Sequence, residues 1–262
     1  GGERNRDYRI TWIRDSSFLL WGLFTLGFEW EAFEYFSFLA ETVAGGDVQI
    51  MYGIDGEKDL TEHTLDHLYG YGGARPVRIG NGAFDQKQHD VWGMLVDSFA
   101  LHVRHNGLAQ QLPRPAWEMI AGYVEDAIAH WQEPDRGIWE VRGDPTHFTA
   151  SKVLCWVALD RGVQIAEERG DEERAERWRA VAEEIKSEVC DRGVDERGVF
   201  KQRYDADALD ASLLLIPLMG FLPPDDERVR ATVLAIADEL TEDGLVLRYR
   251  VDETDDGLAG EE

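Results

Sequence analysis

Length, composition and charge already limit what this protein can be. Its 262 residues are 44% hydrophobic and 11% aromatic, enough for a large buried core, which excludes a mainly disordered chain. Asp and Glu number 52 against 27 Lys and Arg, and the resulting net charge of -25 repels nucleic-acid phosphates and anionic lipids. We therefore expect neither nucleic acid nor a membrane as a partner.

The basic residues and the cysteines indicate the environment. Only five of the 27 basic residues are Lys, a bias that favours solubility in concentrated salt but also follows from a GC-rich genome. Cys155 and Cys190 lie in helical patterns without metal-ligand spacing, so we expect two buried thiols in a reducing cytoplasm. No apolar run reaches the roughly 18 residues that span a bilayer.

Apolar periodicity predicts eight helices in four consecutive pairs. The pairs are 16–28 with 30–43, 88–105 with 114–132, 148–169 with 171–190, and 206–220 with 225–240. Almost no alternating β pattern accompanies them. The predicted fold class is therefore all-α, built from αα-hairpins.

The segment 45–82 differs from the rest because it is rich in Gly and Tyr and has little helical periodicity. A loop of this length in a compact domain usually forms or covers a functional site. His63 and His67 have the spacing of two ligands on one helical face, yet the Glu of a zinc-protease motif does not follow His63. We expect no metal and no cofactor.

A weak internal repeat supports the hairpin arrangement. The sequence RGIWEVR at 136–142 is echoed by RGVFKQR at 197–203, and a shorter GLVLR follows at 244–248. The first two precede a helical pair, as in a toroid where each hairpin buries its apolar face against the next. No further helical pair follows the third, so we expect the toroid to be incomplete.

Candidate site residues gather in the segments before the helical pairs, where aromatic and charged side chains of the kind that bind sugars occur together. Asp15 stands at a helix start, so an N-cap is an equally good interpretation. Glu140 follows Trp139 in an apolar setting suited to a proton donor, although a salt bridge to Arg142 is the alternative. The candidates are Tyr8, Trp12, Arg14, Asp15, Trp139, Glu140, Arg142 and Arg248.

Six motifs, in order along the chain, resemble glycoside hydrolase family 15, the glucoamylases and prokaryotic trehalases. They are DYRITWIRD at 7–15, IMYGIDG at 50–56, RPVRIGN at 75–81, GIWEVRG at 137–143, HFTASK at 147–152 and DALDAS at 207–212. The resemblance implies an (α/α)6 toroid with about eight of its twelve helices present. It also implies an inverting, exo-acting hydrolase that releases glucose from α-glucosides.

The resemblance further implies a role for each candidate. Glu140 matches the general acid of the family. The substrate ligands are Tyr8 beside the developing oxocarbenium ion, Arg14 and Asp15 on glucose hydroxyls, Trp12 and Trp139 as pocket walls, and Arg142 and Arg248 as further sugar contacts.

The sequence also departs from the family pattern. The general base, a Glu in a late loop, has no counterpart here, and neither the last helices nor a preceding β-sandwich domain is recognised. We therefore expect residues 1–262 to be part of a catalytic domain that is nearly inactive alone and exposes an apolar seam. Trehalose and α-1,4-glucans are both open as substrates. The alternative function is a non-catalytic sugar-binding or sensing protein.

Overall fold

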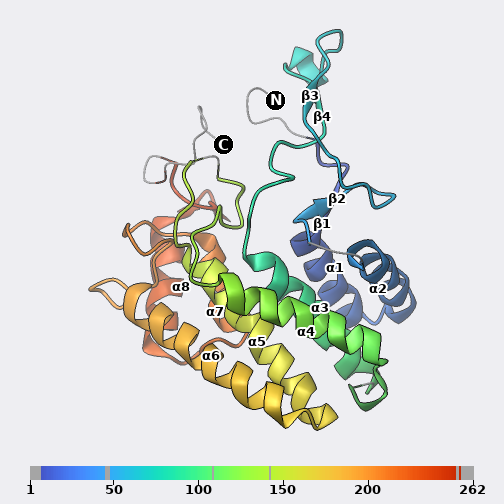
Figure 1. Ribbon diagram of the computed structural model, residues 1–262. Coiled ribbons are helices and arrows are strands. Elements are labelled where there is room, and N and C mark those ends of the chain that lie inside the picture. Colours follow the sequence, from blue (N-terminus) through green and yellow to red (C-terminus); the bar gives the residue numbers. More distant parts are fainter. Residues whose placement is uncertain (1–6, 45–47, 108, 142, 252–253, 255–262) are drawn as a thin grey trace.

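The computed structural model describes residues 7–44, 48–107, 109–141, 143–251 and 254, and this part of the chain is mainly helical. Helices α1, α3, α5 and α7 contact one another in that order as one layer, while α2, α4 and α6 each pack on the preceding helix as a second layer (Figure 1). The helices are α1 (Ile13–Leu26), α2 (Glu29–Val43), α3 (Asp90–Asn106), α4 (Arg114–His130), α5 (Thr149–Arg169), α6 (Glu172–Arg192), α7 (Leu215–Leu218) and α8 (Glu227–Glu239). The first three predicted hairpins are confirmed.

Within the described residues, the strands form three short two-stranded antiparallel pairs. The pairs are β1 (Thr11–Trp12) with β2 (Met51–Tyr52), β3 (His63–Thr64) with β4 (Arg78–Ile79), and β5 (Thr241–Glu242) with β6 (Leu245–Val246). The described part of the segment 45–82 contains only such strands and one 3-10 turn, and its β3–β4 hairpin projects away from the helices (Figure 1). His63 lies in β3, so it does not share a helical face with His67.

Helix α5 forms the centre of the core. Every residue from Thr149 to Leu159 is buried, as expected for a helix surrounded by others. Gly93 of α3 lies against the Leu154 backbone, where any Cβ would collide with the carbonyl, so only Gly allows the two helices to approach this closely. Among the described helices none is both long and apolar enough to cross a membrane.

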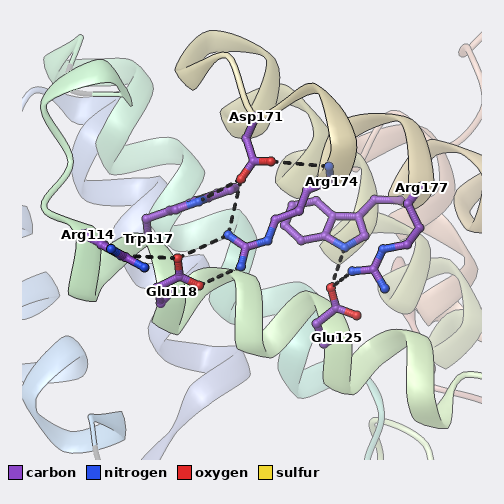
Figure 2. Close-up of polar contacts among 8 residues, drawn as sticks. Arg114, Trp117, Glu118, Glu125, Asp171, Arg174 and Arg177 are labelled. Carbon is purple, nitrogen blue, oxygen red and sulfur yellow. Dashed lines mark hydrogen bonds and ion pairs between the residues drawn. The ribbon is translucent and has the colours of Figure 1, made fainter.

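Helices α4 and α6 of the second layer are joined by a surface network. Arg174 pairs with Glu118 at 2.7 Å and with Asp171 at 3.3 Å, and its guanidinium carbon lies 5.5 Å from the ring of Trp117 (Figure 2). A second Arg–Glu pair from the same two helices lies beside it. Because exposed pairs contribute at most about 1 kcal/mol each, the network orients the helices more than it stabilises them.

Three predictions about local structure need correction. The helix predicted at 206–220 is helical only from Ala211, as a 3-10 turn (Ala211–Leu214) followed by α7. Asp210 ends the preceding extended segment by accepting from the Ser212 amide, which is the behaviour of a capping residue. The helix predicted from residue 88 begins two residues later, at Asp90. Cys155 is buried as expected, but Cys190 is half-buried, and both are free thiols.

The internal repeat corresponds to a repeated turn. Its glycines Gly137, Gly198 and Gly244 have φ angles of 64°, 76° and 83°, in the region that favours Gly. The first two turns lead into α5 and into the 3-10 turn before α7, and the third lies between β5 and β6. The repeat in sequence is thus a repeat of backbone conformation.

Candidate active site

The start of α1 carries the first group of predicted site residues. Pairing of β1 with β2 sets Trp12 opposite Met51 and leaves Trp12 only 6% exposed. The Ile13 amide then donates to the Ile50 carbonyl at 3.0 Å, which fixes where the helix begins. Tyr8 precedes this small sheet and is 65% exposed.

Arg14 joins α1 to the start of α3. Its Nη1 donates to Gln88 Oε1 at 3.1 Å and to Asp90 Oδ2 at 2.9 Å, and its guanidinium carbon lies 5.5 Å from the Trp12 ring. The Asp90 side chain is almost fully buried, and such a carboxylate requires a compensating charge. Trp12 Nε1 and Asp90 Oδ1 are buried, and neither has a hydrogen-bond partner among the described residues.

The N-cap interpretation of Asp15 is wrong. The N-cap position of α1 is Trp12, whose side chain makes no capping bond, and Asp15 lies in the first turn of the helix. Its carboxylate is exposed and is favoured there by the positive end of the helix dipole. The Asp15 carboxylate therefore makes no capping hydrogen bond and is exposed to solvent.

The loop between α4 and α5 carries the second group. Its ends are joined by mutual backbone hydrogen bonds of 2.9 Å between Asp135 and Thr146. Glu140 has φ 58°, an uncommon conformation for a residue with a side chain, and its side chain is half-buried. Such backbone strain is often found at functional sites, where the surrounding structure maintains it.

Trp139, next to Glu140, is fixed on two sides. Its indole Nε1 donates to both carboxylate oxygens of Asp210, at 2.8 and 3.0 Å. The Arg248 guanidinium carbon lies 5.3 Å from the Trp139 ring. The structure therefore brings together three of the predicted site residues, Trp139, Glu140 and Arg248, and places Asp210 beside them.

Two glutamines link the two groups. Gln88, which binds Arg14, donates to Gln86 at 3.1 Å, and Gln86 donates to the Val141 carbonyl at 3.5 Å. The segments before α1, before α3 and between α4 and α5 all rise from one end of the helical layers (Figure 1). The predicted sugar contact Arg142 lies outside the described residues.

A buried carboxylate supports the loop that carries Glu140. Asp135 Oδ2 accepts from the His89 amide at 2.9 Å and from the Ser151 hydroxyl at 2.8 Å. Burial raises the pKa of Asp135 to about 7 and lowers the pKa of the His89 imidazole to about 4. This carboxylate thereby ties the loop to the starts of α3 and α5.

A buried lysine holds the same loop at its beginning. Lys152 of α5 is fully buried, and its Nζ donates to the carbonyls of Trp131 and Glu133. Burial lowers the pKa of Lys152. These carbonyls follow α4 directly, so the end of that helix and the start of the loop are bound to α5.

Sequence reasoning missed three residues of the site. All three, Gln88, Asp90 and Asp210, lay inside predicted helices, 88–105 and 206–220, and Asp210 was also one letter of the motif at 207–212. Asp90 and Asp210 both stand at or just before a helical start, where an Asp is normally interpreted as a cap. No local pattern identifies the distant donors that they bind.

Comparison with known proteins now places the chain. The model of glycosyl hydrolases family 15 matches residues 2–262. This chain belongs to that family. It is 61% identical over 266 residues to a trehalase of Mycobacterium tuberculosis, and 37% identical over 265 residues to a trehalase of Thermoplasma volcanium. Each alignment covers 100% of this chain but only 39% and 41% of the relative, so the chain spans about two fifths of these trehalases.

Solved structures confirm the predicted fold. A wild-type glycosidase superimposes with a TM-score of 0.72 at 21% identity, covering 92% of this chain and 64% of the other. A bacterial glucoamylase solved with acarbose gives 0.66 at 15% identity, covering 89% of this chain and 34% of the other. The described helices thus form part of an (α/α)6 toroid.

Proposed function

We propose that this chain supplies the glucose pocket and the proton donor of an inverting, exo-acting α-glucosidase whose substrate is trehalose. The observation that carries the proposal is Glu140, held in a left-handed turn beside a Trp139 that Asp210 and Arg248 fix in place. The choice of trehalose over α-1,4-glucans rests on the 61% identity to a trehalase along the whole chain.

The residues at the start of α1 and those of the loop between α4 and α5 have different roles in this proposal. Glu140 protonates the glycosidic oxygen, and Arg14 and Asp15 at the start of α1 bind hydroxyls of the glucose that is released. The two tryptophans, Trp12 and Trp139, provide apolar faces for the ring.

Inversion needs a second carboxylate, which activates water on the opposite face of the sugar. From the family resemblance, we expect this general base outside residues 1–262. The matched trehalases are longer than this chain, which supports the expectation. Under this proposal, residues 1–262 bind sugar but turn it over slowly.

The test uses the complete gene product with Glu140→Gln. Loss of the proton donor should lower kcat on trehalose by about 10²- to 10⁴-fold, because general acid catalysis contributes that much. Trehalose binding, measured by calorimetry, should survive. Asp144→Asn, an exposed carboxylate of the same loop, is the matched control and should leave kcat unchanged.

The products report the stereochemistry. Inverting cleavage of trehalose releases one α-glucose and one β-glucose, which proton NMR distinguishes before mutarotation. Two α-glucose molecules would exclude inversion. Binding of trehalose without turnover by the unmodified complete protein would favour a sugar-binding or sensing function instead.

A further inference from the structure

Asp210 is a buried carboxylate surrounded by donors from different parts of the chain. It is 1% exposed, and it accepts from Trp139 Nε1 at 2.8 and 3.0 Å, from Gln202 Nε2 at 2.8 Å and from the Ser212 amide at 2.7 Å. Burial raises the pKa of Asp210, whereas these hydrogen bonds act in the opposite direction. A carboxylate with this many donors is a strong and directional acceptor.

Three segments that lead to or follow different hairpins meet at Asp210, two at its carboxylate and one at its backbone. Trp139 comes from the loop before α5 and Gln202 from the second copy of the repeated turn. The third segment is attached through the backbone, because the Ala211 amide donates to the Arg248 carbonyl at 2.8 Å and Asp210 is bridged to Tyr249. Asp210 therefore sets the position of both Trp139 and the segment that carries Arg248.

The orientation of Trp139 bears directly on Glu140. The indole is held at its edge by Asp210 and on its face by Arg248, so its ring plane has little freedom. Glu140 is the next residue along the backbone and has φ 58°, a conformation that persists only when its surroundings maintain it. The Trp139 side chain and the Glu140 carboxyl are therefore separated by a single peptide, so the fixed indole also restricts where that carboxyl lies.

We propose that Asp210 is a positioning residue for catalysis, which fixes the Trp139 indole and thereby aims the Glu140 carboxyl at the glycosidic oxygen. This inference rests on the proposed function of Glu140 as proton donor. Asp210 itself need not touch the substrate. It acts by holding the Glu140 carboxyl in place, and a displacement of about 1 Å of such a group can lower the rate about 100-fold.

A double-mutant cycle tests the inference in the complete gene product. Asp210→Asn keeps the size of the side chain but removes the carboxylate, and should lower kcat on trehalose by about 10- to 100-fold with little change in KM. Trp139→Phe keeps an apolar wall but removes the indole donor, and should lower kcat similarly. In the Trp139→Phe background, Asp210→Asn should have less than about a threefold further effect.

The outcomes separate the inference from the proposed function. The positioning role is wrong if Asp210→Asn lowers kcat equally with and without the indole. It is also wrong if Trp139→Phe leaves kcat unchanged, and this second test can be made even if the Asp210→Asn protein does not fold. Asp207→Asn, at an exposed carboxylate three residues away, should leave kcat unchanged. If Glu140→Gln retains turnover, the proposed function itself is wrong, whatever the cycle gives.

Discussion

The imidazole of His89 should make the stability of this protein depend on pH. It is 1% exposed, stacks on Trp92 at 5.2 Å between ring centroids, and neither ring nitrogen has a hydrogen-bond partner among the described residues. Burial lowers its pKa from 6.5 to about 4, the positive charges of Lys152, His130 and Lys87 act in the same direction, and Glu133 opposes them.

The sign of the effect follows from which state takes up the proton. The unfolded chain protonates His89 near pH 6.5, while the folded protein resists until about pH 4, so stability is fully present above pH 6.5 and is lost as pH falls. The interval between these two pKa values corresponds to about 3 kcal/mol of unfolding free energy at pH 4. Replacement by His89→Gln should remove this dependence.

The assay compares the two proteins by urea unfolding, followed by tryptophan fluorescence between pH 7 and pH 4.5. As pH falls from 7 to 4.5, the unfolding free energy of the His89→Gln variant should rise by between about 2 and 3 kcal/mol relative to that of the unmodified protein. Any pH-independent effect of the substitution adds a constant to this difference. Asp135, whose pKa is raised from 3.8 to about 7, makes stability fall as pH rises between these values. It contributes in both proteins, because its bond is to the backbone amide of residue 89, which the Gln variant keeps. His67→Gln, at an exposed position, is the control. A difference that stays constant with pH would refute the reasoning.

Two further predictions concern the backbone and the surface. Gly137→Ala should cost at least about 1–2 kcal/mol in urea unfolding, because φ is 64° and the new methyl would lie 2.9 Å from the Phe148 ring; Gly122→Ala, in open space on α4, should be neutral or stabilising. The 262-residue chain alone should self-associate in light scattering, since Trp30 and Phe28 are 71% and 50% exposed, and Trp30→Glu should reduce this. An unchanged unfolding midpoint in Gly137→Ala would contradict the prediction about the backbone. A monodisperse 262-residue chain would contradict the prediction about self-association.

Much of the fold could be predicted because its signals are local. Apolar periodicity located the helical pairs, and the repeated Gly turns indicated that the pairs recur as units. The failure at 206–210 is also local in origin, since Ala206, Ala208 and Leu209 suit a helix in composition. Tertiary contacts override that preference: the Ala211 amide donates to the Arg248 carbonyl, and Asp210 accepts from Trp139 Nε1.

The site was predicted less completely because its partners are distant in sequence. Arg14 and Trp139 are predicted site residues, and the carboxylates that orient them lie 76 and 71 residues further along the chain. An Asp at a helix start has an adequate local explanation as a cap or as a favourable charge near the dipole. The neighbouring residues in the sequence do not distinguish the two buried Asp residues, Asp90 and Asp210, from the many Asp residues that are exposed to solvent.

The buried carboxylates follow a rule that emerges only in three dimensions. In each case a donor from one helical hairpin, or from the segment that leads into it, reaches a buried Asp belonging to the next hairpin along the chain. The contacts are Arg14 to Asp90, the His89 amide to Asp135, and Trp139 to Asp210. Because a buried carboxylate that loses its donor is costly, each contact fixes the register of one hairpin against the next at the end that carries the site. The same bonds that order the toroid therefore also order the predicted sugar pocket, and the acidic composition contributes to the interior as well as to the surface.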